Sequence, residues 1–235
     1  MISLKEIIII QHCQSEHHIN EMSGGWTDTP LTKLGRKQAN LIGLRLKSKK
    51  LKKIIKEINP ENYTIYSSDL KRAWQTAEIV GEHLNLEIIA EKGLREINTG
   101  VAAGKTKKWA NENRNPKKSK RFDLDYQLFP RGETWREFYS RVCTCMDRII
   151  NSEVKNIIIV THGGTLAYII AWWMKFEDLM LTKAHFSALP ASISVLQESS
   201  YYLGSHNLKL FNDISHLFTL NHSKIEPTRK RLSNH

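Results

Sequence analysis

The sequence predicts a three-layer α/β/α sandwich with a mainly parallel central sheet. Two β-branched runs, at residues 7–10 and 157–160, are entirely apolar, as in strands that are buried on both faces. Each run leads into a histidine, His12 or His162, within a more polar segment. Strand-like and helix-like segments alternate along the chain, which is typical of a parallel sheet covered by helices. Such sheets bind ligands at the carboxyl ends of their strands, so the two histidines mark a candidate site.

Six strands are expected, each a short run of β-branched, aromatic or aliphatic residues bounded by polar or turn-forming residues. They are residues 6–10, 62–66, 87–90, 156–161, 191–196 and 207–211, the last at an edge of the sheet. Glycine, aspartate and proline punctuate residues 13–32, which are expected to form a loop after the first strand.

Five helices are expected between these strands. The first begins at Thr32 and runs to about residue 49, with apolar residues at helical spacing. Its apolar stripe is expected to consist of Leu34, Ala39, Ile42 and Leu46. Ser68 or Asp69 is expected to cap the helix at residues 70–84, because a short oxygen side chain accepts hydrogen bonds from first-turn amides. The other helices are expected at residues 104–112, 133–151 and 165–175.

A single domain is expected over residues 1–222 of the 235-residue chain. Residues 113–132 are polar and basic and contain two prolines, so we predict a mobile insertion near the site. Residues 223–235 are polar and are predicted to form a flexible tail.

Composition argues against several classes of protein. No apolar stretch approaches the roughly 20 residues of a membrane span, and the first residues lack a signal-peptide pattern, so no membrane partner is expected. The formal net charge is +11, but the basic segments lack interleaved aromatic residues, so nucleic-acid binding is not expected. The three cysteines (Cys13, Cys143 and Cys145) indicate free thiols in a reducing, cytoplasmic compartment. No oligomeric state is indicated.

Two histidines and an arginine at one sheet edge would form a cationic pocket suited to a phosphoryl group. Imidazole attacks phosphorus when its tautomer is held and the transferring oxygens are neutralised. Arg72 offers a planar fork to two such oxygens. Gly163 and Gly164 allow a phosphate to approach the backbone at a helix N-terminus. Glu96 is a candidate acid for the leaving oxygen, and no ligand cluster predicts a metal ion or another cofactor.

Several motifs, in order, resemble the histidine phosphatase superfamily, also called phosphoglycerate mutase-like, over roughly residues 12–217. They are Gln11-His12-Cys13, residues 25–32, residues 66–77, Leu94-Arg95-Glu96-Ile97, Gly132-Glu133 and Thr161-His162-Gly163-Gly164. The resemblance implies a phosphorylated His12, phosphoryl oxygens clamped by Arg72 and His162, and Glu96 as general acid and then base. The substrate-binding residues that it implies are Gln11, Ser15, His18, Gly25 and Gly163.

The chain departs from the family pattern in its charges. Gln11 stands where the family has an arginine, and this loss is expected to cost about 2–4 kcal/mol of transition-state stabilisation, or roughly 30- to 1,000-fold in rate. His18 stands where the family has an asparagine, and a protonated His18 would restore part of the positive charge.

The leading interpretation is a metal-independent phosphatase that acts on a small phosphorylated molecule. A phosphoglycerate mutase-type transferase is the first alternative. The second is a phospho-ligand binding or regulatory protein with weakened catalysis, which Gln11 favours. Basic side chains in the insertion indicate a substrate with more than one negative group; they are Lys117, Lys118, Lys120 and Arg121.

Overall fold

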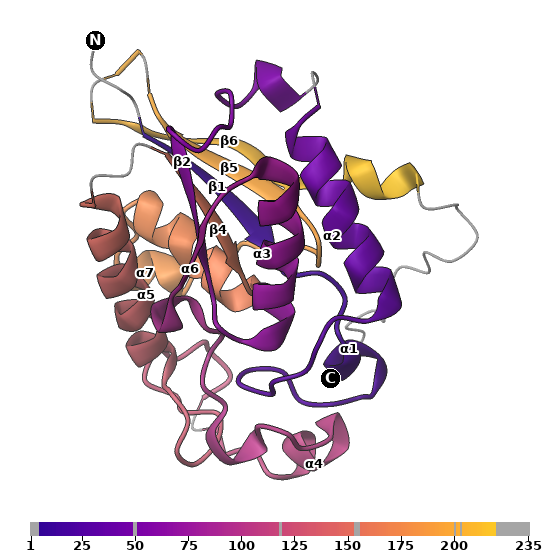
Figure 1. Ribbon diagram of the computed structural model, residues 1–235. Coiled ribbons are helices and arrows are strands. Elements are labelled where there is room, and N and C mark those ends of the chain that lie inside the picture. The colour runs from indigo at the N-terminus through magenta and orange to yellow at the C-terminus, as the bar shows by residue number, and fades with distance from the viewer. Residues whose placement is uncertain are drawn as a thin grey trace.

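A six-stranded sheet in the order β3-β2-β4-β1-β5-β6 forms the centre of the molecule, with helices on both faces (Figure 1). The computed structural model describes residues 5–48, 51–117, 119–152, 156–199, 201–202 and 204–219. The strands are β1 (Glu6–Gln11), β2 (Tyr63–Ser67), β3 (Ile88–Ala90), β4 (Asn156–Thr161), β5 (Ile193–Glu198) and β6 (His206–Asp213). The predicted tail, and residues 220–222 of the predicted domain, lie outside the described residues.

The first four strands of the chain pair in parallel, whereas β5 pairs antiparallel with both β1 and β6. The predicted mainly parallel sheet is therefore confirmed, and β6 lies at an edge as expected. All six strands overlap the ranges predicted from the sequence.

Seven α-helices accompany the sheet in the described part of the chain. They are α1 (Glu16–Ile19), α2 (Lys33–Leu46), α3 (Lys71–Leu84), α4 (Lys107–Glu112), α5 (Trp135–Ile150), α6 (Gly163–Trp173) and α7 (Asp178–Leu181). The five predicted helices are all present, but α1 and α7 were not predicted. Each has only four residues, too few for a helical period to show in the sequence.

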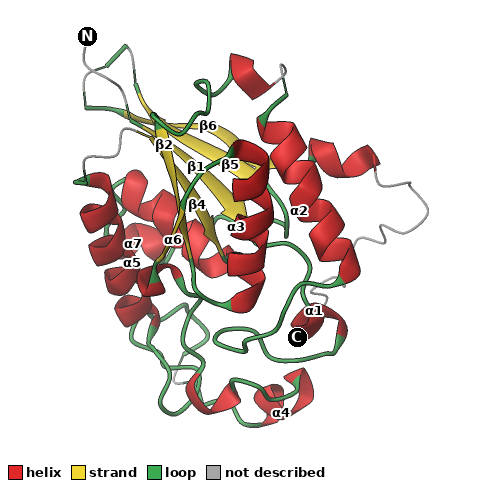
Figure 2. Cartoon of the chain, in the orientation of Figure 1, coloured by secondary structure: helices red, strands yellow, loops and turns green. Residues whose placement is uncertain are grey.

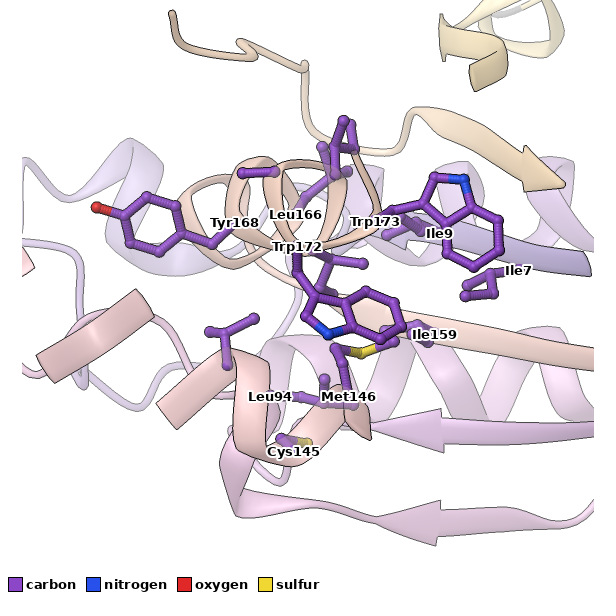
Figure 3. Packing of buried hydrophobic residues seen from close by; sticks show 14 of the residues in the cluster. Ile7, Ile9, Leu94, Cys145, Met146, Ile159, Leu166, Tyr168, Trp172 and Trp173 are labelled. Atoms are coloured by element: carbon purple, nitrogen blue, oxygen red, sulfur yellow. The ribbon is translucent and has the colours of Figure 1, made fainter. Parts of the chain in front are cut away.

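The isoleucines of β1 explain the three layers, because successive side chains of a strand point to opposite faces. Ile7 and Ile9 pack in one apolar cluster, with residues of α5 and α6 (Figure 3). Ile8 and Ile10 pack in a second cluster, with residues of α2 and α3. Burial on both faces is the reason that its four central residues, 7–10, are all apolar.

The predicted stripe of α2 is wrong at one position. Ala39, Ile42 and Leu46 are buried, but Leu34 is 38% exposed. Leu34 precedes Ala39 by five residues and so lies on another face of the helix, whereas Gly35, four residues before Ala39, is buried.

The predicted cap of α3 is also wrong. The N-cap residue is Leu70, and the amide of Lys71 donates instead to Oδ1 of Asp28, at 2.7 Å. Asp69 instead forms an ion pair with Arg95, in which Nε of Arg95 lies 2.6 Å from Oδ1 of Asp69. The cap therefore comes from a loop that is distant in sequence.

The predicted insertion contains no strand or α-helix among its described residues. It is held by hydrogen bonds within itself: the amide of Asn115 donates to the carbonyl of Leu128 (3.0 Å), and the hydroxyl of Tyr126 donates to the carbonyl of Asn115 (2.7 Å). Its mobility stays a prediction.

Loops, α1 and α4 gather beyond the carboxyl ends of the parallel strands (Figure 2). The three cysteines are free, as predicted. Within the described ranges, no helix has the length and apolar character needed to cross a membrane.

Candidate active site

The carboxyl ends of β1 and β4 bring the two predicted histidines together. These strands are parallel neighbours in which Gln11 pairs with Thr161, so His12 and His162 follow at the same edge. Their rings meet edge to face, with centroids 5.0 Å apart. His12 is 4% exposed and His162 is completely buried.

Hydrogen bonds hold His12 in one tautomer. Its Nδ1 lies 2.8 Å from the carbonyl oxygen of Cys13, and a carbonyl oxygen only accepts, so Nδ1 carries the proton. Arg72 donates from Nε to His12 Nε2 at 3.1 Å, so Nε2 carries the lone pair. Burial, and next the charge of Arg72, lower the pKa of His12 well below its usual value. The ring is therefore neutral near pH 7, with a nucleophilic Nε2.

Arg72 links the nucleophile candidate to the loop between β1 and α2. It is 1% exposed, and its guanidinium also donates to the carbonyl oxygens of Thr27 (2.6 Å) and Gly25 (2.8 Å). Burial lowers the pKa of Arg72 to about 10, while Glu96 and Asp28 act in the opposite direction. The side chain stays charged near pH 7 and provides a buried cation beside His12.

Gly25 has a left-handed backbone, with φ of +60°. A Cβ atom on this residue would lie 2.4 Å from Oγ1 of Thr99, so another side chain does not fit. The structure thus connects Gly25 to the site through its carbonyl contact with Arg72.

Two buried polar atoms at this edge have no hydrogen-bond partner among the described residues: Nδ1 of His162 and Oε1 of Gln11. The other ring nitrogen of His162 lies 2.8 Å from Oγ of Ser68. Gly163 follows at the start of α6, and a Cβ atom on it would come within 3.3 Å of the Gln11 side chain. Unpaired polar atoms of this kind are available to a ligand.

Glu96 lies against the N-terminus of α6. Its Oε2 accepts from the amide of Gly164 at 2.9 Å, and its Oε1 accepts from the amide of Ile97 at 3.0 Å. The predicted acid is therefore bound to Gly164, which follows His162 by two residues in the chain.

We expect Gly164→Ala to displace Glu96, because the added Cβ would lie 2.5 Å from Oε1 of that carboxylate. A misplacement of about 1 Å costs up to about 100-fold, so kcat for an alkyl phosphate is expected to fall by about 10- to 100-fold. Gly24→Ala is the matched control, since nothing lies within 4 Å of the Cβ it would add. Equal rates for the two variants would contradict this placement of Glu96.

Arg141 of α5 holds the segment that carries Glu96, and sequence reasoning missed it. Its guanidinium donates to the carbonyl oxygens of Gly93 (2.9 Å), Arg95 (3.1 Å) and Glu96 (3.1 Å), and it pairs with Glu133 at 2.6 Å. The signal was a charge three residues after the fully buried Phe138, on the apolar side of the helix.

His17 and His18 extend the imidazole cluster. The ring of His18 stacks on that of His12, with centroids 5.4 Å apart, and its Nδ1 accepts from the amide of Ser15. Burial and the Arg72 charge lower the pKa of His18 to about 4, and burial followed by the His18 charge lowers that of His17 to about 3. Both rings are therefore neutral near pH 7, so His18 does not meet in the free protein the condition, protonation, under which it would restore positive charge. His17 was not predicted, although the His17-His18 pair is visible in the sequence.

Ser15 is completely buried and begins α1, with Oγ 2.8 Å from Nδ1 of His17. The structure thus brings all the predicted site residues to one edge of the sheet. The arrangement combines a neutral imidazole, a buried cation, a carboxyl group and a helix N-terminus, which together suit transfer of an anionic group. Among the described residues, no three or more His, Cys, Asp or Glu side chains are grouped so that they could hold a metal ion.

Comparison with known proteins places this geometry in a family. The family model described as histidine phosphatase superfamily (branch 1) matches residues 7–214. A broad-specificity phosphatase of Saccharomyces cerevisiae is 30% identical over 183 residues, which cover 73% of this chain and 71% of the yeast protein. Phosphoglycerate mutase-like protein 4 of Arabidopsis thaliana is 30% identical over 171 residues, which cover 70% and 69% of the two chains.

Solved structures agree in fold. A mycobacterial glucosyl-3-phosphoglycerate phosphatase matches with a TM-score of 0.69 and 22% identity, over 89% of this chain and 99% of its own. An alpha-ribazole phosphatase from Shigella flexneri matches with a TM-score of 0.68 and 19% identity, over 88% and 96% of the two chains. The chain therefore belongs to the histidine phosphatase superfamily, with the phosphoglycerate mutase-like fold that its sequence predicts.

Proposed function

We propose that this protein is a metal-independent phosphomonoester phosphatase that works through a phosphohistidine on His12. The observation that carries the proposal is the tautomer of His12: Nδ1 is held by the Cys13 carbonyl, which leaves the lone pair on Nε2. Phosphatases among its relatives support the reaction class, and the superfamily supports a small phosphorylated substrate.

In the first half-reaction, Nε2 of His12 attacks phosphorus and the bond between phosphorus and the ester oxygen breaks. The Nε–H of Arg72 now occupies Nε2, so it must first turn to a phosphoryl oxygen. The leaving alcohol oxygen takes the proton of a protonated Glu96. Nδ1–H stays on the Cys13 carbonyl and spreads the positive charge of the phosphorylated ring.

In the second half-reaction, water attacks the phosphorus of the phosphohistidine. The Glu96 carboxylate takes a proton from that water, and the bond between Nε2 and phosphorus breaks to release inorganic phosphate. Glu96 is protonated again for the next substrate. Arg72, His162 and the N-terminus of α6 supply the stabilisation of negative charge that a metal ion provides in other phosphatases.

The test is phosphate release from an aryl phosphate in the presence of EDTA, followed by acid and alkaline quenching of the reaction. A phosphohistidine is expected to survive alkali, to be lost in acid, and to map to His12 by mass spectrometry. Activity that disappears with EDTA, or a phosphoenzyme on another residue, would contradict the proposal.

Gln11 favours a second candidate, a phospho-ligand binding protein with weakened catalysis. Its side chain is 7% exposed, with Oε1 unpaired among the described residues, and it brings no charge to the site. Both candidates predict phosphate binding, so only turnover separates them.

We expect Gln11→Arg to raise kcat, because a guanidinium would add a second cation to the transferring group. The gain is expected to be about 30- to 1,000-fold, the reverse of losing about 2–4 kcal/mol of charge stabilisation. Gln197→Arg, at the far end of β5, is the control for added charge alone. A Gln11→Arg protein that binds phosphate but turns over no faster would show that Gln11 does not limit the rate.

Phosphoglycerate mutases also occur among the relatives, for example in Bartonella bacilliformis, at 27% identity over 201 residues. A mutase needs a bisphosphate to prime it, whereas a phosphatase releases phosphate without one. Full activity without bisphosphate is the result that we expect.

A further inference from the structure

A cavity of 410 Å³ runs from Gly164 along α6, between α5 and the segment that follows α7. The large apolar or aromatic side chains that line it are Phe122, Trp135, Phe138, Tyr168, Leu181 and Phe186, and Thr182, Lys183 and His185 line it as well. A volume of this size matches the pockets of about 300–1,000 Å³ in which proteins bind small organic molecules.

Gly164, which lines the cavity, also binds Glu96. The amide of Gly164 donates to Oε2 of Glu96 at 2.9 Å. From the place where Gly164 would carry a Cβ, Oε1 of Glu96 is 2.5 Å away and Cε1 of Phe138 is 3.2 Å away. The carboxyl group of Glu96 and the ring of Phe138 therefore both lie beside Gly164, in the first turn of α6.

Tyr168 lies on the same helix one turn further, and its hydroxyl is buried without a partner among the described residues. Its ring contacts that of Phe138, with centroids 4.9 Å apart. The hydroxyl points away from the core side chains of Trp173 and Ile9 (Figure 3). Burial, with the charge of Glu96, raises the pKa of Tyr168, so it stays a donor.

We propose that this cavity binds the leaving group of the substrate, and that the preferred substrates are phosphomonoesters of apolar, ring-containing alcohols. This assignment rests on the proposed function. The oxygen that Glu96 protonates is the first atom of the leaving group, so the rest of that group must begin beside Glu96. Gly164, which binds Glu96, lines a cavity with aromatic walls, and the Tyr168 hydroxyl can donate to one polar atom of the ring system.

The same lining disfavours strongly polar alcohols. Each hydroxyl of a sugar or of glycerol placed among these rings would lose its hydrogen bonds to water, and the Tyr168 hydroxyl is the buried group that could replace one of them. Thr182, Lys183 and His185 also line the cavity, and the last two are exposed. Apolar groups gain from the same burial, and even one methylene in an apolar pocket is worth about 10-fold or more.

The test compares kcat/KM for 1-naphthyl phosphate and for glycerol 3-phosphate. We expect the naphthyl ester to be preferred by about 10-fold or more. Ala167→Leu fills the cavity next to Gly164 and is expected to remove most of this preference, with little effect on glycerol 3-phosphate. Ala39→Leu is the matched control, since Ala39 is equally buried but packs in the cluster on the other face of the sheet.

Phe186→Ala is a second variant that tests the cavity without adding volume to it, because it removes a half-buried ring from the cavity lining. It is expected to raise KM for the naphthyl ester by about 10-fold while the fold is kept. Equal kcat/KM for both esters, unchanged by Ala167→Leu and Phe186→Ala, would overturn the cavity assignment and leave the phosphatase intact. Absence of hydrolysis of both esters, with no phosphoenzyme, would overturn the proposed function and this assignment with it.

Discussion

Replacing His12 with alanine is expected to lower kcat by roughly 10⁴-fold or more, because the reaction loses its nucleophile rather than one stabilising contact. The phosphoenzyme should disappear together with turnover. The measurement is phosphate release from an aryl phosphate in EDTA, with quenched samples analysed for phosphohistidine.

The His12 variants need a check on folding, since alanine leaves the buried Nε of Arg72 without its acceptor. His12→Asn retains a polar side chain there and is expected to melt near the wild-type temperature and still to bind inorganic phosphate. His83→Ala is the matched control, since that imidazole bonds to Asn40 between α2 and α3. A His12→Asn protein that binds phosphate and turns over at the wild-type rate would eliminate His12 as the nucleophile.

Replacing Glu96 with glutamine is expected to lower kcat for alkyl phosphates by about 10²- to 10⁴-fold, the usual contribution of a positioned general acid. The amide cannot protonate the leaving oxygen. The NH2 group of the glutamine would face the backbone N–H of either Gly164 or Ile97, and two donors cannot bond to each other. One hydrogen bond is therefore lost, at a cost of about 1–3 kcal/mol in the free energy of unfolding. Glu87→Gln, on the exposed surface, is the control for loss of charge.

The leaving group separates the two proposed roles of Glu96. A nitrophenyl ester leaves without a proton, so Glu96→Gln should form the phosphoenzyme from it readily but hydrolyse it slowly. The expected signature is a burst of nitrophenolate, equal to the enzyme concentration, followed by a slow phase. A loss of rate that is the same for nitrophenyl and alkyl esters, without a burst, would argue against acid–base catalysis by Glu96.

The sheet and the place of the site were predictable because the four central positions of β1 and of β4 are all apolar. Burial on both faces favours such runs, and a sheet with helices on both sides, which is typically parallel, provides that burial. Once these strands are recognised, the shared carboxyl edge brings His12 and His162 together without further information, and the motifs around Arg72 and Glu96 complete the prediction.

The contacts that hold the site residues in place could not be predicted from the sequence, because they join residues that are far apart in the chain. Asp28 replaces Ser68 and Asp69 as the cap of α3, since the loop after β1 folds over that helix. Arg141 holds the carbonyl of Glu96 from 45 residues away. Nothing local distinguishes Asp28 from a charge on the surface, and the position of Arg141 on the apolar side of its helix does not reveal which carbonyl groups it binds.

The sequence alone determined the fold class, because local apolar pattern carries this information, and its motifs and their resemblance to the family gave the candidate reacting side chains and the missing cation at Gln11. Only the tertiary structure decided the tautomer of His12, the neutral state of His18 and the cavity beside Glu96. Each depends on burial and on neighbours from several elements: the Cys13 carbonyl and Arg72 set the tautomer, and desolvation sets the charge. Such properties exist only after the chain has packed.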